Sequence, residues 1–381
     1  SLTYNRKINT LTRLKMGLIA HQIFFDFFKE TAPRSASSDI TQTNFKRVTS
    51  FSGSGSTQTA QAFAQLSHQL NAKTTVHIGI HALHLFLNNT SSLEPRTSIK
   101  HQFSPRQSLS LAYGLHGQIL PLSAYFFTKK DTINGQVIDN QPNKNLKPIK
   151  SHHLILGYNY VSPNDLKWNI ETYLQKMYDV PVQDDAKSLY WMLNEQQEFP
   201  EFKVVNAGKG LNYGVDASIE KFFSKRFYFL LTASYFKAKY APRSGTYYDS
   251  KFGTTFISGL TAGKEFTFKN ASVLQVGFRS MYNGGFRYTP LDVAKATTTH
   301  RYEPLLGQEW SKQVAPYRRI DLRIAYTRNK RAFSSVLALD IQNLTNYHNI
   351  SYVGYDPSKN GLYFSGHPSG FTPILSYRCD F

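Results

Sequence analysis

The chain has 381 residues, of which 44 are Lys or Arg and 25 are Asp or Glu, so its formal net charge at neutral pH is +19. Aromatic residues make up 14% of the chain, and this content of large apolar groups excludes an intrinsically disordered protein. No apolar run approaches the roughly 18 residues that a membrane-spanning helix needs, and the single cysteine, Cys379, excludes a disulfide scaffold. The first residues lack the charged-then-apolar pattern of an export signal, so we expect any such signal to lie upstream or to have been removed, and we interpret the chain as a fragment or a mature product.

Apolar and polar residues alternate along most of the chain, which is the period of a β-strand. Residues 319–327, RIDLRIAYT, show the pattern clearly. No helical stripe of apolar residues continues for three turns. Alternation, interrupted by polar or Pro/Gly clusters, predicts about fifteen strands. They are residues 1–8, 13–29, 57–71, 73–87, 93–103, 107–121, 150–161, 165–177, 209–222, 225–239, 252–268, 271–283, 317–328, 332–345 and 371–381.

The connections between these strands alternate in length. The tight connections are residues 9–12, 72, 104–106, 162–164, 223–224, 269–270 and 329–331. The long connections are residues 30–56, 122–149, 178–208, 240–251, 284–316 and 346–370, with a shorter member at 88–92. Short turns on one side and long loops on the other are typical of bacterial outer-membrane barrels, whereas a soluble β-sandwich has no reason to alternate them.

The last predicted strand has one apolar and one polar face. Phe371, Leu375, Tyr377, Cys379 and Phe381 share the first, together with Pro373, and Ser376, Arg378 and Asp380 share the second. A soluble barrel would turn the apolar set inward, but a barrel of about fifteen strands or more is too wide for side chains to fill. We therefore predict an all-β fold, an antiparallel transmembrane β-barrel of the outer membrane.

Several segments resemble the TonB-dependent outer-membrane receptors, in particular those of Bacteroidetes. The segments are 93–96 (LEPR), 104–111 (SPRQSLSL), 113–116 (YGLH), 178–182 (YDVPV), 208–214 (GKGLNYG), 220–223 (EKFF), 260–266 (LTAGKEF), 340–346 (DIQNLTN) and 373–381 (PILSYRCDF). Each is weak alone, but together they recur in the family's order from about residue 14 to the end.

The resemblance implies a barrel of about 22 strands, closed by an N-terminal plug that an inner-membrane energy-coupling protein pulls upon. Residues 1–381 would then be the C-terminal portion of one such barrel, with the plug and about seven strands missing. It also implies that the barrel-assembly machinery reads the C-terminal signal Phe371, Leu375, Tyr377, Cys379 and Phe381. In the full-length parent we expect TonB-coupled import of a scarce ligand, such as a ferric siderophore or a glycan.

Two other classes of function stay open at this point. The first is an unplugged, passive channel of the porin type, and the second is a soluble carbohydrate-binding module. For the receptor interpretation the expected partners are outer-membrane lipid and lipopolysaccharide, the barrel-assembly machinery, the TonB complex acting through the missing plug, and a surface lipoprotein.

The histidines suggest a metal site at first sight, because His77, His81 and His84 have helical zinc-ligand spacing. On a strand, residues four apart are separated by about 13 Å, which no single ion bridges. We expect His77 and His81 on the lumen wall and His84 on the other face near the outer rim. His152 and His153 should point to opposite faces.

No enzymatic motif of the kinds we sought occurs: there is no G-x-S-x-G, H-E-x-x-H or P-loop pattern. We therefore expect no catalytic residue, no cofactor and no bound metal, and leave the ligand-binding residues unassigned. The basic residues are spread over strands and loops instead of clustered with exposed aromatics, which disfavours nucleic acid. The acidic loop with Asp184, Asp185, Glu195, Glu198 and Glu201 lacks the EF-hand spacing and is interpreted as solvated.

Tyr and Trp are expected at both membrane boundaries. The candidates for these girdles are Phe126, Phe127, Tyr158, Tyr160, Tyr235 and Tyr240. Trp191 and Trp310 lie in long loops, where they could stack on a ligand, but we favour a role in closing each loop upon itself.

Overall fold

The computed structural model describes residues 1–31, 48–133, 136–195, 200, 202–366 and 370–381. Fifteen strands follow one another in chain order in a single antiparallel sheet, and β13 (Tyr248–Asp249) pairs with β12. The fifteen are β1 (Leu2–Lys7), β2 (Thr12–Thr31), β3 (Val48–Asn71), β4 (Thr74–Leu85), β5 (Thr90–Ser104), β6 (Gln107–Gln118), β9 (Ile149–Val161), β10 (Leu166–Gln183), β11 (Val204–Ser224), β12 (Phe227–Ala241), β14 (Phe256–Thr267), β15 (Val273–Asn283), β18 (Tyr317–Asn329), β19 (Ser334–Gln342) and β22 (Thr372–Asp380).

Each predicted strand corresponds to one strand of this sheet, which confirms the all-β antiparallel prediction. The main difference lies at the ends that carry the long loops. β10 continues to Gln183 and β11 begins at Val204, so both run into the predicted loop 178–208. The reason is that the hydrogen-bonded ladder continues past a shift in register between Met177 and Val180. Most of the long connection predicted at residues 30–56 lies outside the described residues.

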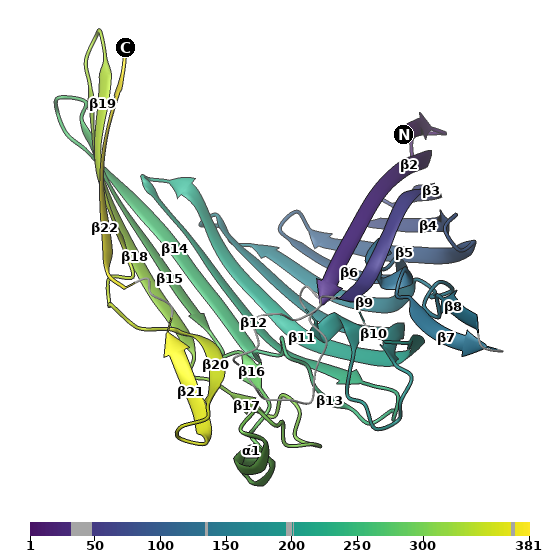
Figure 1. Ribbon diagram of the computed structural model, residues 1–381. Helices are drawn as coiled ribbons and strands as arrows, with labels where there is room; N and C mark the ends of the chain where they lie inside the picture. Colours follow the sequence, from purple (N-terminus) through teal and green to yellow (C-terminus); the bar gives the residue numbers. More distant parts are fainter. Residues whose placement is uncertain (32–47, 134–135, 196–199, 201, 367–369) are drawn as a thin grey trace.

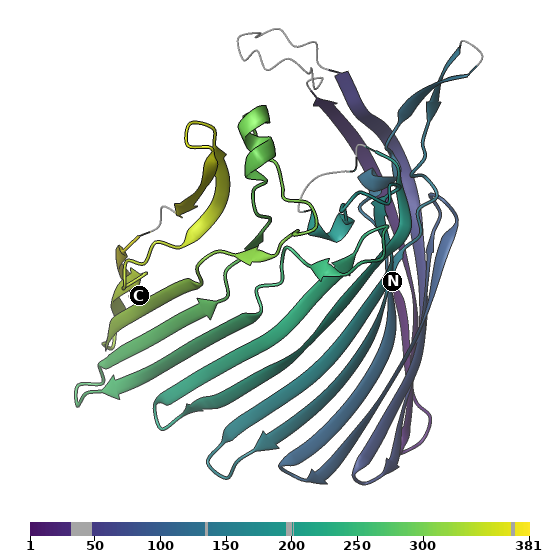
Figure 2. The same cartoon turned by 90° about the horizontal axis from the view of Figure 1, so that it is seen from below.

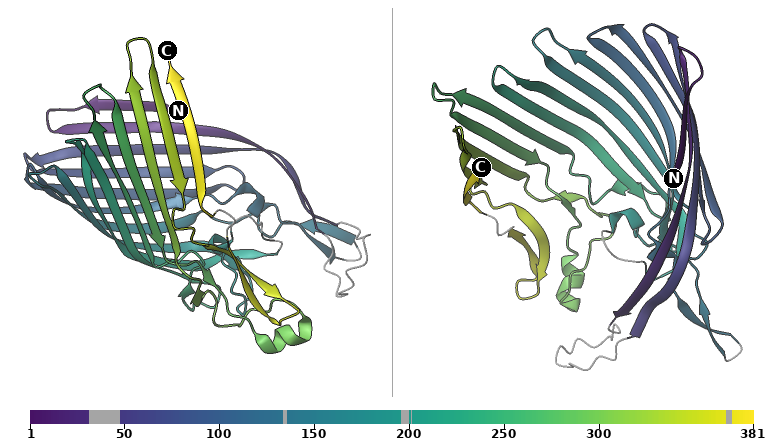
Figure 3. Two further views of the ribbon diagram at one scale, coloured as in Figure 1. Left: turned by 90° about the vertical axis from the view of Figure 1, so that its left-hand side faces the viewer. Right: turned by 90° about the horizontal axis from the view of Figure 1, so that it is seen from above.

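The sheet is strongly curved and open (Figure 1). β1 forms one edge and β22 the other, and the two edges face each other across the mouth of a trough (Figure 3). Tight turns lie at one end of the strands and long connections at the other (Figure 2). Within the described ranges, no helix is long and apolar enough to span a bilayer.

The two faces of the sheet differ in chemistry. The convex face exposes aliphatic and aromatic side chains, such as Ile78, Leu154 and Tyr377, whose exposed fractions are 58%, 44% and 67%. The residues that alternate with them along each strand point to the concave face, and they include His81 and Arg323. The expected arrangement, an apolar exterior and a polar interior, is therefore present.

The long connections contain small elements that the alternation did not predict. They are η1 (Leu122–Tyr125), β7 (Lys129–Ile133), β8 (Gln136–Asn140), η2 (Met192–Asn194), β16 (Arg287–Tyr288), α1 (Val293–Thr299), β17 (Lys312–Gln313), β20 (Ile350–Asp356) and β21 (Gly361–Gly366). α1 has fewer than three turns, so it leaves no detectable stripe. Its N-cap is Asp292, whose side chain accepts a hydrogen bond from the Lys295 amide.

The largest apolar core lies where the loops fold onto the concave face at the ends of the strands. It consists of Leu85, Leu120, Ala124, Tyr125, Leu146, Ile149, Met177, Val180, Val182, Trp191, Met192, Val204 and Tyr240. The loops are thus packed structures that narrow the trough on its loop side.

Candidate functional site

A continuous line of polar side chains crosses the concave face below the loop core. We call it the inner polar band. It consists of Gln61, His81, Glu94, Arg96, His116, His153, Gln175 and Asn212, contributed by seven neighbouring strands from β3 to β11. The register places these residues beside one another, because directly opposite residues of antiparallel strands share a face.

Glu94 is the most buried member of the inner polar band, with 1% of its surface exposed. Its Oε2 is 2.7 Å from Arg96 Nη2 and 3.0 Å from His81 Nδ1, and His81 Nε2 is 3.1 Å from Gln61 Oε1. Its Oε1 has no hydrogen-bond partner among the described residues. A buried carboxylate needs partners that replace water, and Arg96 and His81 supply them to Glu94.

Gly117 makes room for this carboxylate. A Cβ atom at position 117 would lie 2.3 Å from Ser92 Oγ and 2.7 Å from Glu94 Oε1. Both distances are too short for real contacts, so only glycine fits without a shift of the wall. Sequence reasoning missed Glu94 and Gly117, because their proximity depends on the register of β5 and β6.

The second half of the inner polar band contains no Asp, Glu, Lys or Arg side chain. The rings of His116 and His153 lie 4.7 Å apart, edge to face. His153 Nε2 is 3.1 Å from Gln175 Nε2, and Asn212 donates to Gln175 Oε1 at 2.8 Å. The resulting surface offers many donors and acceptors to a polar ligand.

The band borders a hollow of about 500 Å³ on the concave face, lined among others by Phe63, His77, His81, Arg96, His116 and His153. The hollow combines an aromatic ring, imidazoles and one guanidinium. This chemistry suits binding of a polar or anionic group. Within the described residues, no group of three or more His, Cys, Asp or Glu is placed to hold a metal ion.

The structure places the individual histidines as the strand geometry predicted. His77 hydrogen-bonds Ser67 at 2.7 Å and lies on the same face as His81. His84 lies on the other face, where it hydrogen-bonds Ser91 at 2.8 Å.

His152 and His153 lie on opposite faces, as expected. His152 points to the convex side, where its ring lies between the rings of Tyr113 and Tyr178. His153 points inward to the band.

The acidic loop is held by ion pairs where it can be described. Asp184 Oδ2 is 2.7 Å from Lys203 Nζ, and Asp184 Oδ1 is 3.7 Å from Arg243 Nε. The hydrogen bond from Lys203 lowers the pKa of Asp184 below its ordinary value. Glu198 and Glu201 lie outside the described residues.

Two of the predicted girdle aromatics are wrong. Tyr240 is 1% exposed and packs against Trp191 on the concave side, at a ring distance of 5.4 Å. Tyr235, five residues away, is 56% exposed on the convex face. An odd spacing on a strand always gives opposite faces, so the sequence already held the signal that only one of the two could face outward.

Phe126 is the second wrong girdle residue. Its ring packs against Phe25, at 4.8 Å, inside the loop assembly. Burial raises the pKa of the neighbouring Tyr125 phenol to about 12, and the Leu120 amide donates to its oxygen at 3.3 Å.

Trp191 has the loop-closing position that we favoured. It is 4% exposed and bridges to Val182 at the end of β10. Trp310 lies in the loop between β15 and β18, where its carbonyl accepts from Arg287 Nη1 at 3.0 Å and its ring is 5.4 Å from Lys251 Nζ.

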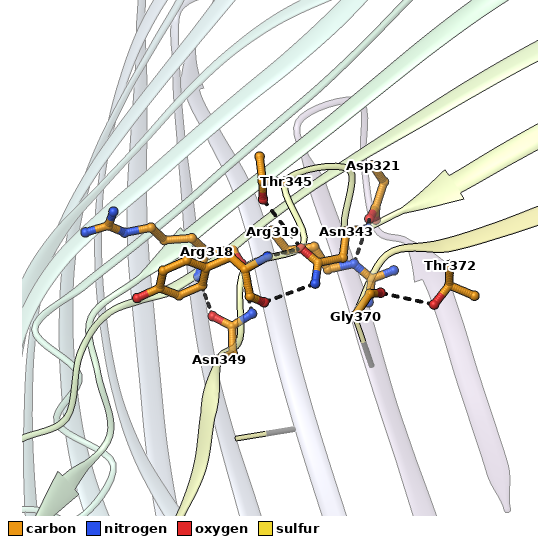
Figure 4. A network of polar contacts seen from close by, with 9 residues as sticks. Arg318, Arg319, Asp321, Asn343, Thr345, Asn349, Gly370 and Thr372 are labelled. Atoms are coloured by element: carbon orange, nitrogen blue, oxygen red, sulfur yellow. Dashed lines mark hydrogen bonds and ion pairs between the residues drawn. The ribbon is translucent and has the colours of Figure 1, made fainter. Parts of the chain in front are cut away.

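Asparagines fix the start of the last long loop (Figure 4). The Asn343 amide donates to Asp321 Oδ1 at 2.9 Å, and Asn343 Nδ2 donates to the Tyr347 carbonyl at 3.0 Å. Asn349 makes a reciprocal pair with the Arg318 backbone, at 2.7 Å and 2.9 Å. The segment 340–346 therefore anchors the loop to β18.

The anchored loop then contacts the helix of the preceding loop. Tyr355 Oη donates to the Ala296 carbonyl at 3.2 Å and is 2.8 Å from Asn360 Oδ1. The ring of Tyr288 packs against Phe364 at 5.6 Å. The hairpin of β20 and β21 and α1 are thus one packed unit beside the mouth of the trough (Figure 2).

Three of the five C-terminal signal residues, Leu375, Tyr377 and Cys379, lie on the convex face of β22, and Phe371 and Phe381 flank the strand just outside its ends. Leu375 pairs with Leu339, Tyr377 with Leu337 and Cys379 with Ser335. Phe381 is fully exposed, and its ring lies 6.5 Å from that of Phe333. Their recognition by the assembly machinery remains a prediction.

The comparisons with known proteins decide the family. The family model "TonB dependent receptor-like, beta-barrel" matches residues 2–344. The chain belongs to this family. TonB-dependent receptors are receptors and transporters, not enzymes, and barrels of this family lie in the outer membrane. The search of curated proteins found no significant match.

Solved TonB-dependent siderophore receptors share the fold. The ferric yersiniabactin receptor FyuA of Yersinia pestis is 12% identical, with a TM-score of 0.66 over 99% of this chain and 52% of its own. The pyoverdine receptor FpvA of Pseudomonas aeruginosa is 13% identical, with a TM-score of 0.65 over 100% of this chain and 52% of its own.

The siderophore receptor PiuA of Acinetobacter baumannii is 14% identical, with a TM-score of 0.61 over 99% of this chain and 54% of its own. This chain therefore spans about half the length of these TonB-dependent receptors.

Proposed function

We propose that the full-length protein is an outer-membrane receptor that binds a scarce ligand, such as a ferric siderophore or a glycan, and imports it by TonB-coupled active transport. The observation that supports this proposal is the family match over residues 2–344, joined to a fold shared with siderophore receptors from three organisms. In this proposal residues 1–381 are the C-terminal portion of one barrel, and a plug and the first strands belong to the rest of the protein.

The structure offers two surfaces that a ligand would meet. A ligand that enters from the loop side would first meet the packed loops at the mouth and then the hollow beside the inner polar band. The exposed aromatic side chains of the β20–β21 hairpin include Tyr352, Tyr363 and Phe364, at 57%, 46% and 47%. The Arg96 guanidinium at the hollow favours an anionic group on the ligand, and the aromatic rings of the hairpin offer flat apolar surfaces for it to stack on.

The test is uptake by a strain that lacks the full-length gene and by the same strain complemented with it. Iron-55 chelates and labelled oligosaccharides are supplied separately, with and without a protonophore. We expect one ligand class to enter only in the complemented strain and only while the protonophore is absent. Uptake that is insensitive to the protonophore would favour a passive channel of the porin type.

A further inference from the structure

The convex face carries a group of lysines that the receptor function does not use. We call it the lysine patch. It consists of Lys176 on β10, Lys209 on β11, and Lys237 and Lys239 on β12. None of the four lysine side chains makes a hydrogen bond or an ion pair with any described residue.

The register holds the four lysines close together. Lys176 and Lys239 both pair with Leu211, from its two sides, and Lys237 pairs with Tyr213, two residues along β11. Lys209 lies two residues beyond Leu211 in the other direction. With strands about 4.8 Å apart and about 3.3 Å per residue, the four Cα atoms fall within roughly 14 Å of one another. Four unpaired cations at this spacing repel one another unless an anion lies between them.

The lysine patch lies directly beyond an apolar band. On the same strands and the same face, Leu174, Val215 and Leu231 have exposed fractions of 44%, 43% and 37%. From Phe227 to Tyr235 the band on β12 is about nine residues long, which is the length of a tilted transmembrane strand. Tyr213 and Tyr235 close it, as aromatic residues do at a membrane boundary.

The patch also lies on the side of the long loops. β12 starts at the tight turn after Ser224 and ends in the loop after Ala241. Lys237 and Lys239 are therefore near its loop end, which in an outer-membrane barrel is the extracellular side. The acidic residue paired with Lys239, Asp249, has its carboxylate 3.0 Å from Arg287 Nη1.

We propose that the lysine patch binds the phosphate groups of an outer-leaflet glycolipid, lipopolysaccharide. The inference rests on the proposed outer-membrane location. Charge complementarity selects this occupant: the patch is at headgroup depth, where flexible lysine stems reach out of the apolar band, and phosphate is the anion found there. The apolar band below receives the acyl chains of the same molecule. An acidic protein is excluded as the partner, because the bilayer covers the surface around the lysine patch that such a protein would have to contact.

The experiment uses the full-length protein, purified and freed of lipid in detergent. Binding of bisphosphorylated lipid A and of the same lipid without phosphates is measured by native mass spectrometry. The patch variant combines Lys176→Gln, Lys209→Gln, Lys237→Gln and Lys239→Gln. A second variant changes the same four lysines to Arg. The control variant removes four cations at the tight-turn end: Lys225→Gln, Arg226→Gln, Lys264→Gln and Lys269→Gln.

We expect wild type, the Arg variant and the control to bind phosphorylated lipid A equally. The patch variant should bind it about 600-fold more weakly, because each of the four lysines contributes about fivefold near an anionic surface. Removal of the phosphates should weaken wild type to the level of the patch variant.

Equal binding by the patch variant and wild type would overturn the proposal, as would equal binding of the two lipids by wild type. Membrane fractionation of wild type tests the outer-membrane location independently. A wild-type protein in the outer membrane whose patch variant binds normally would therefore refute the lysine patch and leave the receptor function standing.

Discussion

Replacement of Glu94 by alanine is the sharpest test of the inner polar band. The side chain is 1% exposed and accepts from Arg96 at 2.7 Å and shares a hydrogen bond with His81 at 3.0 Å. Glu94→Ala removes both bonds and leaves two donors on the concave wall without their acceptor. Hydrogen bonds to a charged group contribute about 1.5–3 kcal/mol each.

The expected loss is smaller than the sum of two such bonds. The Arg96 side chain is 45% exposed, so water can solvate it after the substitution, whereas His81 is 17% exposed and cannot be solvated as well. We therefore expect the free energy of unfolding to fall by about 2–4 kcal/mol. The assay is urea unfolding of the full-length protein in lipid vesicles, followed by tryptophan fluorescence.

Asp380→Ala is the matched control. Asp380 pairs with Arg378 at 3.0 Å, but the two side chains are 56% and 73% exposed, so this ion pair should contribute less than about 1 kcal/mol. If Glu94→Ala and Asp380→Ala change the free energy of unfolding equally, burial does not strengthen the Glu94 contacts. The contacts of Glu94 would then contribute no more to stability than an exposed ion pair.

Three further predictions concern single positions. Phe381→Ala should reduce outer-membrane abundance strongly while Leu339→Ala leaves it near normal, because only the first removes the expected assembly signal; equal abundance by membrane immunoblot would contradict that role. Gly117→Ala should lower the free energy of unfolding by about 1–3 kcal/mol, because the new Cβ atom overlaps the Ser92 and Glu94 side chains. An unchanged urea midpoint would show that these side chains move aside without cost. Because the pKa of Asp184 is lowered in the folded protein, its stabilising pair with Lys203 is present above about pH 4 and is lost as the pH falls through the lowered value. The protection factors of amides in the loop after β10, which correct for the pH dependence of intrinsic exchange, should therefore fall below about pH 4, and Asp184→Asn should abolish that dependence. A pH-dependent protection retained in the variant would contradict the assignment.

The strand order could be predicted because two local signals coincide along this chain. Alternation marks each strand, and turn residues such as Asn9 and Asn270 end it; their side chains accept from the amides of Leu11 and Ser272. Both signals are local in sequence, so a single sequence carries them.

The inner polar band could not be predicted in the same way. Whether His81 meets Glu94 depends on the register of β4 and β5, and alternation defines two faces without fixing which residue of the next strand lies opposite. The loop elements were missed for a related reason. Tyr355 and Asn360 stabilise their hairpin against α1, which lies about sixty residues earlier in the chain.

The polar contacts of the concave face are made between neighbouring strands, so they do not depend on closure of the sheet. Glu94 Oε2 is paired with β4 and with its own strand, Gln175 with β9 and β11, and Asp321 with Arg319 on its own strand and with the Asn343 amide. Each of these three side chains is therefore paired within its own strand or with an adjacent strand or the connection that follows it. In the described part of the large sheet, β1 and β22 are the edge strands, and each leaves a row of backbone groups without a neighbouring strand. The convex face has no such local solution, since its apolar side chains are separated by the pleat and can be covered only by a continuous apolar medium. The polar side of this sheet is thus specified by pairs of neighbouring strands, and its apolar side by the bilayer in which the receptor is proposed to lie.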